Sequence, residues 1–292
     1  MLHHHLTGPA GAPPLVLGPS LGTSTAVWAA LTPALSRRFR VLRYDLPGHG
    51  GSPTGLLPSP GPGRTTVDDL ADLVLGLADH HGWDRFHYAG ISLGGAVGAR
   101  LAARRPARIA SLALVCSSAR FGPPEPWRER AALVRTEGIA PLLTTAPGRW
   151  FASPDTAGTP FAQQLLADLA TADPAGYAAC CDALAGYDLR SELYRIAAPA
   201  LVVGGSRDTA TPPVHARELA AGITGSRLLL LDCGHLAAER PRELAAALAP
   251  HLHQAHSGAA PPPERPAPAQ PPARDRKRNP GSAGGASRST LR

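Results

Sequence analysis

Several features that would mark other classes of protein are scarce in or missing from this 292-residue sequence. Aromatic residues make up only 5%, and there are four cysteines, at positions 116, 180, 181 and 233. Their spacing fits neither a zinc site nor a small disulfide-bonded domain. The sequence contains no stretch of 18 or more apolar residues, so no membrane span is expected. The N-terminus lacks the apolar core of a cleavable signal sequence. We therefore expect a soluble, cytoplasmic protein with reduced thiols and no membrane partner.

The positive charge of the chain is concentrated at its C-terminus. The formal net charge is +7, and residues 256–292 carry seven basic against two acidic residues, so the remainder is close to neutral. The same stretch consists mainly of Pro, Ala, Gly, Ser and Arg, and it has too little apolar surface to offset the entropy of ordering. We expect a disordered basic tail over 256–292. A nucleic-acid partner is not expected, because the tail has charge without interleaved aromatic residues.

Strand-like and helix-like segments alternate along the first part of the chain. Short apolar or β-rich runs at 2–8, 13–18, 38–45, 86–90 and 109–116 predict strands. Between them, residues 65–82 have the periodicity of an amphipathic helix with Thr66 as N-cap, and a small-residue helix runs from 93 to about 106. This alternation predicts an α/β fold with a mostly parallel central sheet and helices on both faces.

The pattern changes between residues 117 and 198. This segment has helical periodicity interrupted by Pro and Gly, and no convincing strand. Alternation resumes over 199–255. We therefore expect an α/β core made of residues 1–116 and 199–255, with residues 117–198 inserted as a helical cap, or lid.

A serine between two glycines provides the first chemical signal. The sequence GISLG, residues 90–94, matches G-x-S-x-G and stands between a predicted strand and a predicted helix. Glycines on both sides leave room for a strained turn that lifts the hydroxyl above the sheet. This context favours Ser92 as a nucleophile over a loop serine, although the bare pattern is common in a glycine-rich chain.

A nucleophilic serine needs a base, and the position of His235 suits that role. It follows the apolar strand LLLLD and the short turn CG, so it should lie at the carboxyl end of a late parallel strand. The other histidines are interpreted as structural or surface residues. His49 is expected to shape the GHG loop, and the remainder fall in strands, in helices or near the tail.

The acid that orients the base is expected between serine and histidine in the chain. Asp208 follows the strand ALVVG at the same edge of the sheet, and we expect it to hold the imidazole of His235. Asp232 is interpreted as a turn residue, and Asp45 as a residue that holds the GHG loop. An oxyanion hole would take one backbone N–H from Leu93, directly after the nucleophile, and a second from Leu21 in the loop GPSLGTS.

Together these motifs make residues 1–253 resemble an α/β-hydrolase, and more narrowly the 3-oxoadipate enol-lactonases. The segments that carry the resemblance are LGPSLGTSTAVW, RFRVLRYDLPGHGGSP, GISLGGAVGARLAARRPARI, GRWF, DPAGYAACCDAL, DLRSELYRIAAPALVVGGSRDTATPP and DCGHLAAERP. The resemblance implies a helical lid inserted after the sixth strand. It departs from that family at Pro19, where Asn or His is usual, and in DLPGHG, where DTRGHG is expected.

The resemblance implies a serine hydrolase that opens 3-oxoadipate enol-lactone in the β-ketoadipate pathway of aromatic catabolism. Its partner would be a small anionic lactone, and no cofactor or metal is expected. A cation in the lid should hold the carboxylate of the substrate. Arg130, Arg135 and Arg149 are candidates, with Trp150 as a wall of the pocket, although for each residue taken alone a solvated arginine or a core aromatic is the favoured interpretation.

Other functions fit the same residues. A general carboxylesterase or a cofactor-free haloperoxidase-like perhydrolase would use the same Ser-His-Asp arrangement. A non-catalytic binding protein could also keep the fold, although an intact triad argues against it. The sequence does not predict an oligomeric state.

Overall fold

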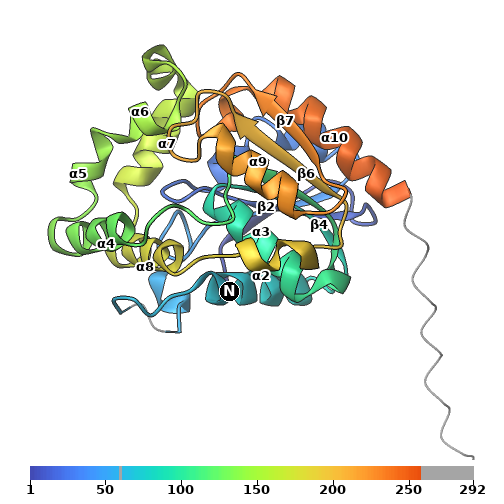
Figure 1. The fold of residues 1–292 in the computed structure, drawn as a ribbon, viewed down its shortest axis with the longest axis horizontal. Helices are drawn as coiled ribbons and strands as arrows, with labels where there is room; N and C mark the ends of the chain where they lie inside the picture. Colours follow the sequence, from blue (N-terminus) through green and yellow to red (C-terminus); the bar gives the residue numbers. More distant parts are fainter. Residues whose placement is uncertain (59–60, 258–292) are drawn as a thin grey trace, which may run out of the picture. The chain divides into compact units, whose positions relative to one another are not determined.

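The computed structural model describes residues 1–58 and 61–257, and these residues contain one seven-stranded sheet (Figure 1). The order of the strands across the sheet is β1-β3-β2-β4-β5-β6-β7. The expected tail lies outside the described residues from 258 onward. The strands are β1 His4–Thr7, β2 Pro14–Gly18, β3 Arg40–Tyr44, β4 Phe86–Ile91, β5 Ile109–Val115, β6 Ala200–Gly205 and β7 Arg227–Leu231.

All neighbouring strands from β3 to β7 run parallel, as predicted. The central strands β4 and β6 are buried along their whole length, because helices cover both faces. The helices of the core are α1 Thr32–Leu35, α2 Val67–His80, α3 Leu93–Arg104, α9 Pro213–Gly222 and α10 Pro241–Ser257, with 3-10 turns at Thr25–Trp28, Thr54–Leu56, Pro106–Arg108 and Ala237–Glu239. The α/β class that the alternation predicts is therefore confirmed.

The expected first strand is present as β1, which pairs antiparallel with β3 through His4 opposite Tyr44. Helix α2 begins as predicted at Thr66. Its hydroxyl accepts a hydrogen bond from the Asp69 N–H at 3.2 Å, and the Asp69 carboxylate accepts one from the Thr66 N–H at 2.8 Å. This capping box fixes the start of the helix because it satisfies backbone donors that the first turn leaves free.

Helices fill the segment between β5 and β6, as the change of periodicity predicts. They are α4 Glu125–Glu137, α5 Ala140–Leu143, α6 Ala146–Trp150, α7 Pro160–Ala170 and α8 Pro174–Ala185, with 3-10 turns at Pro154–Gly158 and Arg190–Arg195. Figure 1 shows α4 to α8, in green to yellow, grouped to one side of the sheet. We call residues 117–198 the cap. The described residues belong to one compact unit, so the boundaries of the cap as a separate domain stay a prediction.

The cap follows the fifth strand of the chain, and the expectation of the sixth is wrong. Five strands precede residue 117, and β1 is the antiparallel strand at that edge of the sheet. The position of the cap relative to the serine strand is unchanged, since β4 and β5 still come directly before it.

The C-terminal end of the core differs in two respects from a simple buried sheet. Strand β7 is an edge strand, and Leu228, Leu229 and Leu230 are 36 to 42% exposed. Helix α10 continues to Ser257, two residues beyond the predicted end of the core at 255. None of the helices in the described ranges is both long and apolar enough to cross a membrane.

Candidate active site

Ser92 occupies a sharp turn between β4 and α3. Its backbone has φ 55° and ψ −117°, in the left-handed half of conformational space that residues with a side chain rarely adopt. The glycines on either side are required by close packing. A Cβ on Gly90 would lie 2.3 Å from the carbonyl carbon of Gly94, and a Cβ on Gly94 would lie 2.5 Å from that of Gly18. The G-x-S-x-G spacing is therefore explained by the space available at the turn.

The strained turn is held by hydrogen bonds to the next strand. The N–H of Ser92 donates to the carbonyl of Val115 at 2.9 Å, and the hydroxyl of Ser117 donates to the carbonyl of Ser92 at 2.8 Å. Ser92 itself is 5% exposed. Strain of this kind persists only where the surroundings over-determine the backbone, and it is concentrated at functional sites.

His235 and Asp208 meet at the carboxyl ends of β7 and β6. The Nδ1 of His235 lies 2.9 Å from Oδ2 of Asp208, and both side chains are buried. The hydroxyl of Thr211 donates to the same carboxylate oxygen at 2.7 Å, and the N–H groups of Ala210 and Thr211 donate to Oδ1 at 2.8 Å each. Both oxygens of the Asp208 carboxylate are therefore bound by groups of the protein.

These contacts decide the charge of Asp208. Burial alone would raise its pKa, but the hydrogen bonds from His235 and Thr211 outweigh burial and hold the pKa of the Asp208 carboxyl below its usual value. Asp208 is therefore an anion at neutral pH, and it favours the tautomer of His235 that carries its proton on Nδ1. By contrast, Asp232 lies at the surface 2.8 Å from Arg207, as expected of a turn residue.

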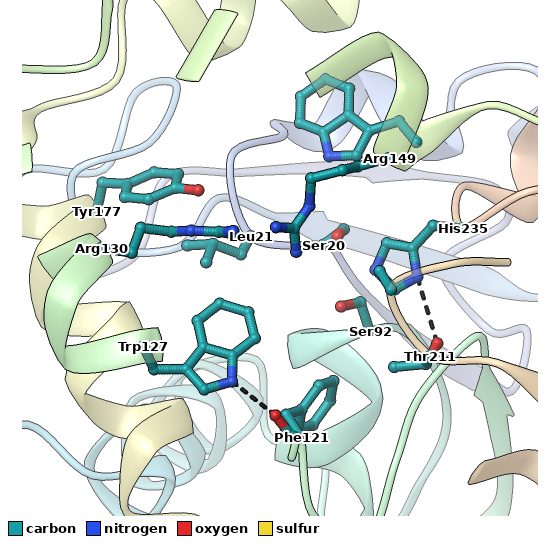
Figure 2. Close-up of a pocket in the computed structure, with 12 residues that line it drawn as sticks. Ser20, Leu21, Ser92, Phe121, Trp127, Arg130, Arg149, Tyr177, Thr211 and His235 are labelled. Atoms are coloured by element: carbon teal, nitrogen blue, oxygen red, sulfur yellow. Dashed lines mark hydrogen bonds between the residues drawn. The ribbon is translucent and has the colours of Figure 1, made fainter. Parts of the chain in front are cut away.

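A single pocket joins Ser92 and His235 to the cap (Figure 2). Figure 2 shows Ser92 below the imidazole of His235 among the residues that line the pocket, and a dashed line joins the ring to the hydroxyl of Thr211 at 3.3 Å. The lining residues of the pocket are Ser20, Leu21, Ser92, Phe121, Trp127, Arg130, Arg149, Trp150, Tyr177, Ala210, Thr211 and His235.

Leu21 lines this pocket, and Leu93 follows Ser92 directly in the chain. Leu93 is the first residue of α3, where backbone N–H groups are free and the helix dipole is positive. Among the described residues, neither the Leu21 nor the Leu93 N–H donates to a backbone carbonyl outside its own element. Their predicted roles in an oxyanion hole remain a prediction.

The loop that carries Leu21 is fastened by His49 and Asp45. The N–H of Gly22 donates to Nε2 of His49 at 3.1 Å, and Nδ1 of His49 faces the Pro47 carbonyl at the same distance. Asp45 accepts hydrogen bonds from the N–H groups of Thr25 and Gly51. The interpretation of Asp45 and His49 as residues that shape loops is confirmed.

Two cap arginines face the pocket without a carboxylate partner in the part of the chain that the structure describes. Arg130 comes from α4, and its guanidinium carbon lies 5.1 Å from the centroid of the Trp127 ring. Arg149 comes from α6, and in Figure 2 it points down toward Ser92 and His235. Burial lowers the pKa of the Arg149 guanidinium, and the neighbouring charge of Arg130 lowers it further. Two partly buried cations of this kind can pair with an anion that enters the pocket.

The third candidate, Arg135, does not reach the pocket. Its guanidinium pairs with Asp182 of α8 at 2.5 Å, and the Asp182 side chain is 4% exposed. Arg130 and Arg135 are five residues apart on α4, which places them on different faces of the helix. The expectation that Arg135 is available to a substrate carboxylate is therefore wrong, whereas Arg130, Arg149 and Trp150 do line the pocket.

Sequence reasoning missed three polar residues of the pocket: Ser20, Tyr177 and Thr211. Thr211 could have been suspected, because it lies three residues after Asp208 in a loop at the edge where the triad was expected. Tyr177 comes from the cap helix α8, and no local pattern predicts its direction. In residues 1–58 and 61–257, no three His, Cys, Asp or Glu side chains are grouped as metal ligands would be.

Comparisons with known proteins agree with this geometry. The family described as the alpha/beta hydrolase fold matches residues 13–239. The chain is 35% identical over 243 residues to 3-oxoadipate enol-lactonase 2 of Acinetobacter baylyi, which covers 82% of this chain and 89% of that protein. It is 30% identical to a putative carbamate hydrolase RutD of Stutzerimonas stutzeri, covering 80% of this chain and 89% of the other. The enol-lactonase crystal structure from Burkholderia xenovorans LB400 aligns with a TM-score of 0.82 at 39% identity, over 86% of this chain and 96% of that chain.

The chain belongs to the α/β-hydrolase family. Within that family it is a hydrolase of carboxylic esters or lactones, and its resemblance to the 3-oxoadipate enol-lactonases is confirmed.

Proposed function

We propose that this protein opens 3-oxoadipate enol-lactone to 3-oxoadipate, the reaction of the β-ketoadipate pathway for aromatic compounds. The observation that carries the proposal is the pair of cap arginines without carboxylate partners in the described chain, which line the same pocket as Ser92 and His235. A neutral ester carries no negative charge that could pair with two partly buried cations. A lactone that bears a carboxylate arm does, because the anionic arm can pair with both guanidinium groups.

Ser92 is the proposed nucleophile. Its oxygen attacks the lactone carbonyl while Nε2 of His235 takes its proton, and Asp208 stabilises the imidazolium that forms. The negative charge on the carbonyl oxygen is held by the N–H groups of Leu21 and Leu93. Losing one such donor costs roughly 2.7 to 4 kcal/mol in other hydrolases.

The ring then opens as the bond between the acyl carbon and the ring oxygen breaks. The leaving enolate takes the proton from His235 and tautomerises to a ketone. A water molecule, activated by His235, attacks the acyl-serine, and the proton returns to Ser92 as the acid is released. Throughout, Arg130 and Arg149 hold the carboxylate arm and keep the ring over the serine.

Turnover of the enol-lactone by the wild type and by Ser92→Ala tests this proposal, with p-nitrophenyl acetate as a neutral reference substrate. We expect rapid, Ser92-dependent opening of the lactone and a much lower kcat/KM for the acetate ester. A strong preference for p-nitrophenyl acetate would instead identify a general carboxylesterase.

A further inference from the structure

The carboxylate of Glu239 joins the loop of the predicted base to the cap. Glu239 lies four residues after His235, and its Oε1 accepts hydrogen bonds from two backbone N–H groups. One comes from Gly234 at 2.6 Å and the other from Ala152 at 3.2 Å. The Ala152 N–H also lies 3.4 Å from Oε2. A single side chain therefore bridges residues that are 82 positions apart in the sequence.

The two backbones that Glu239 bridges are also in direct contact. The N–H of Leu236 donates to the carbonyl of Trp150 at 2.9 Å. A Cβ on Gly234 would lie 2.6 Å from the Ala152 nitrogen and 2.6 Å from the Phe151 carbonyl carbon, so only glycine fits there. The cap segment 149–152 and the histidine loop 232–236 are thus packed backbone against backbone.

Each of the two segments carries a group that acts in the pocket. The cap segment holds Arg149 and Trp150, and the histidine loop holds His235. The histidine loop is fixed to the core as well, because the N–H of Arg207 donates to the Cys233 carbonyl at 3.0 Å. The positions of Arg149 and of His235, the predicted base, are therefore fixed by the same backbone contacts.

The other contacts of Glu239 do not account for its position. Within the described residues its carboxylate is in no ion pair, and the adjacent Arg240 directs its Nε to the Asp232 carbonyl at 3.2 Å. Its helical turn, Ala237–Glu239, is three residues long and needs no charged side chain. Two backbone N–H groups, one from each segment, donate to the same oxygen of this partly buried side chain, so we take the bridge to be its main role.

We propose that Glu239 is a positioning residue that sets the distance between the anion site of the cap and the imidazole of His235. It does so by the reach of its Oε1 atom to both segments rather than by its charge. The anion-site half of this inference rests on the proposed function, whereas the imidazole half needs only an ester hydrolase. A small displacement of either segment is costly, since misplacing a reacting group by about 1 Å can reduce the rate about 100-fold.

Three substitutions separate reach from charge. Glu239→Gln keeps an Oε1 acceptor at the same distance and removes the charge. Glu239→Asp keeps the charge but is one methylene too short to reach both N–H groups. Glu239→Ala removes both, and Glu243→Ala, at an exposed glutamate one helical turn further along, is the matched control.

The assay compares p-nitrophenyl acetate, which is neutral, with mono-p-nitrophenyl succinate, which carries a carboxylate. For Glu239→Ala and Glu239→Asp we expect kcat to fall about tenfold or more on both esters, and KM to rise about tenfold on the succinate ester alone. Glu239→Gln should stay within about threefold of the wild type in every parameter, and so should the control.

The opposite order, with Glu239→Asp active and Glu239→Gln impaired, would overturn the proposal, because charge would then matter rather than reach. So would losses in kcat without any change in the ratio of the two KM values. If Glu239→Ala fails to fold, the Asp and Gln variants still decide the question. If the wild type shows no lower KM for the succinate ester, the anion site of the proposed function fails, and kcat on the acetate ester alone tests Glu239.

Discussion

Two regions meet at the same pocket: the cap, and the group Ser92, Asp208, Thr211 and His235 near the carboxyl ends of the strands, which we call the rim. The charged groups of the two regions have opposite surroundings. On the rim, Asp208 accepts hydrogen bonds from Ala210, Thr211 and His235 before any substrate is present. On the cap, Arg130 and Arg149 face the pocket with no carboxylate partner among the described residues. Asp208 thus has its hydrogen-bond partners within the protein, whereas the two arginines lack a carboxylate that an anionic substrate would supply. We infer that the rim determines the reaction and the cap selects the substrate.

The strongest test of the rim is Asp208→Asn. Asparagine keeps the size of the side chain but favours the wrong tautomer of His235, so we expect kcat to fall by about 10⁴-fold. Because the defect lies in the reaction, the loss should be equal for anionic and neutral esters. Steady-state kinetics on both esters measure it, and a loss restricted to the anionic ester would break the distinction between rim and cap.

Arg135→Ala sharpens the comparison within the cap itself. Removing Arg135 leaves the carboxylate of Asp182 buried and unpaired, which typically costs about 3 to 5 kcal/mol of unfolding free energy. KM for an anionic ester should remain close to that of the wild type, because Arg135 does not line the pocket. Denaturant unfolding and initial rates check the two parts, and a large rise in KM with little loss of stability would contradict the assignment.

A smaller effect is expected for Thr211→Val on the rim. Valine has a similar shape but lacks the hydroxyl that donates to Asp208 at 2.7 Å. One neutral-to-charged hydrogen bond is worth about 1.5 to 3 kcal/mol, and two backbone donors on the same carboxylate remain, so we expect kcat to fall about tenfold. KM for both esters should change little. An unchanged kcat would show that the backbone donors alone position Asp208.

The smallest effect concerns pH and compares His49, beside the rim, with His251, far from it in α10. Burial lowers the pKa of both imidazoles, so the folded protein holds them neutral. The unfolded chain takes up these protons as the pH falls through about 6.5, and stability therefore declines below that pH. Replacing either residue with Gln should flatten this decline by at most about 1.4 kcal/mol per pH unit.

Thermal or denaturant unfolding at pH 5, 6 and 7 measures this slope. Only His49→Gln should also lower activity at pH 7, because His49 accepts the N–H of Gly22 in the loop that carries Leu21. Equal losses of activity in the two variants would contradict the claim that the hydrogen bond between His49 and Gly22 supports catalysis.

Much of the rim could be predicted from sequence because each part follows a local rule. Ser92 stands in a strand–turn–helix pattern, and Asp208 and His235 follow apolar strands whose parallel order brings their ends together. The sequence could not predict which arginines of the cap line the pocket, because these arginines differ only in the direction of their side chains in the folded protein. Arg130 and Arg135 share one helix, and their separation depends on Asp182 of a different helix. Glu239 was missed for the same reason, since its partner Ala152 is close only in the folded chain.

The claim that the cap selects the substrate is tested most directly by the double variant Arg130→Ala/Arg149→Ala. The measurement is the ratio of kcat/KM for 3-oxoadipate enol-lactone to that for p-nitrophenyl acetate, with fluorophosphonate labelling of Ser92 as the control for the rim. Two lost charged contacts at about 1.5 to 3 kcal/mol each predict a fall in the ratio of more than about 100-fold, with labelling unchanged. A ratio equal to that of the wild type in a variant that still labels at Ser92 would contradict the account.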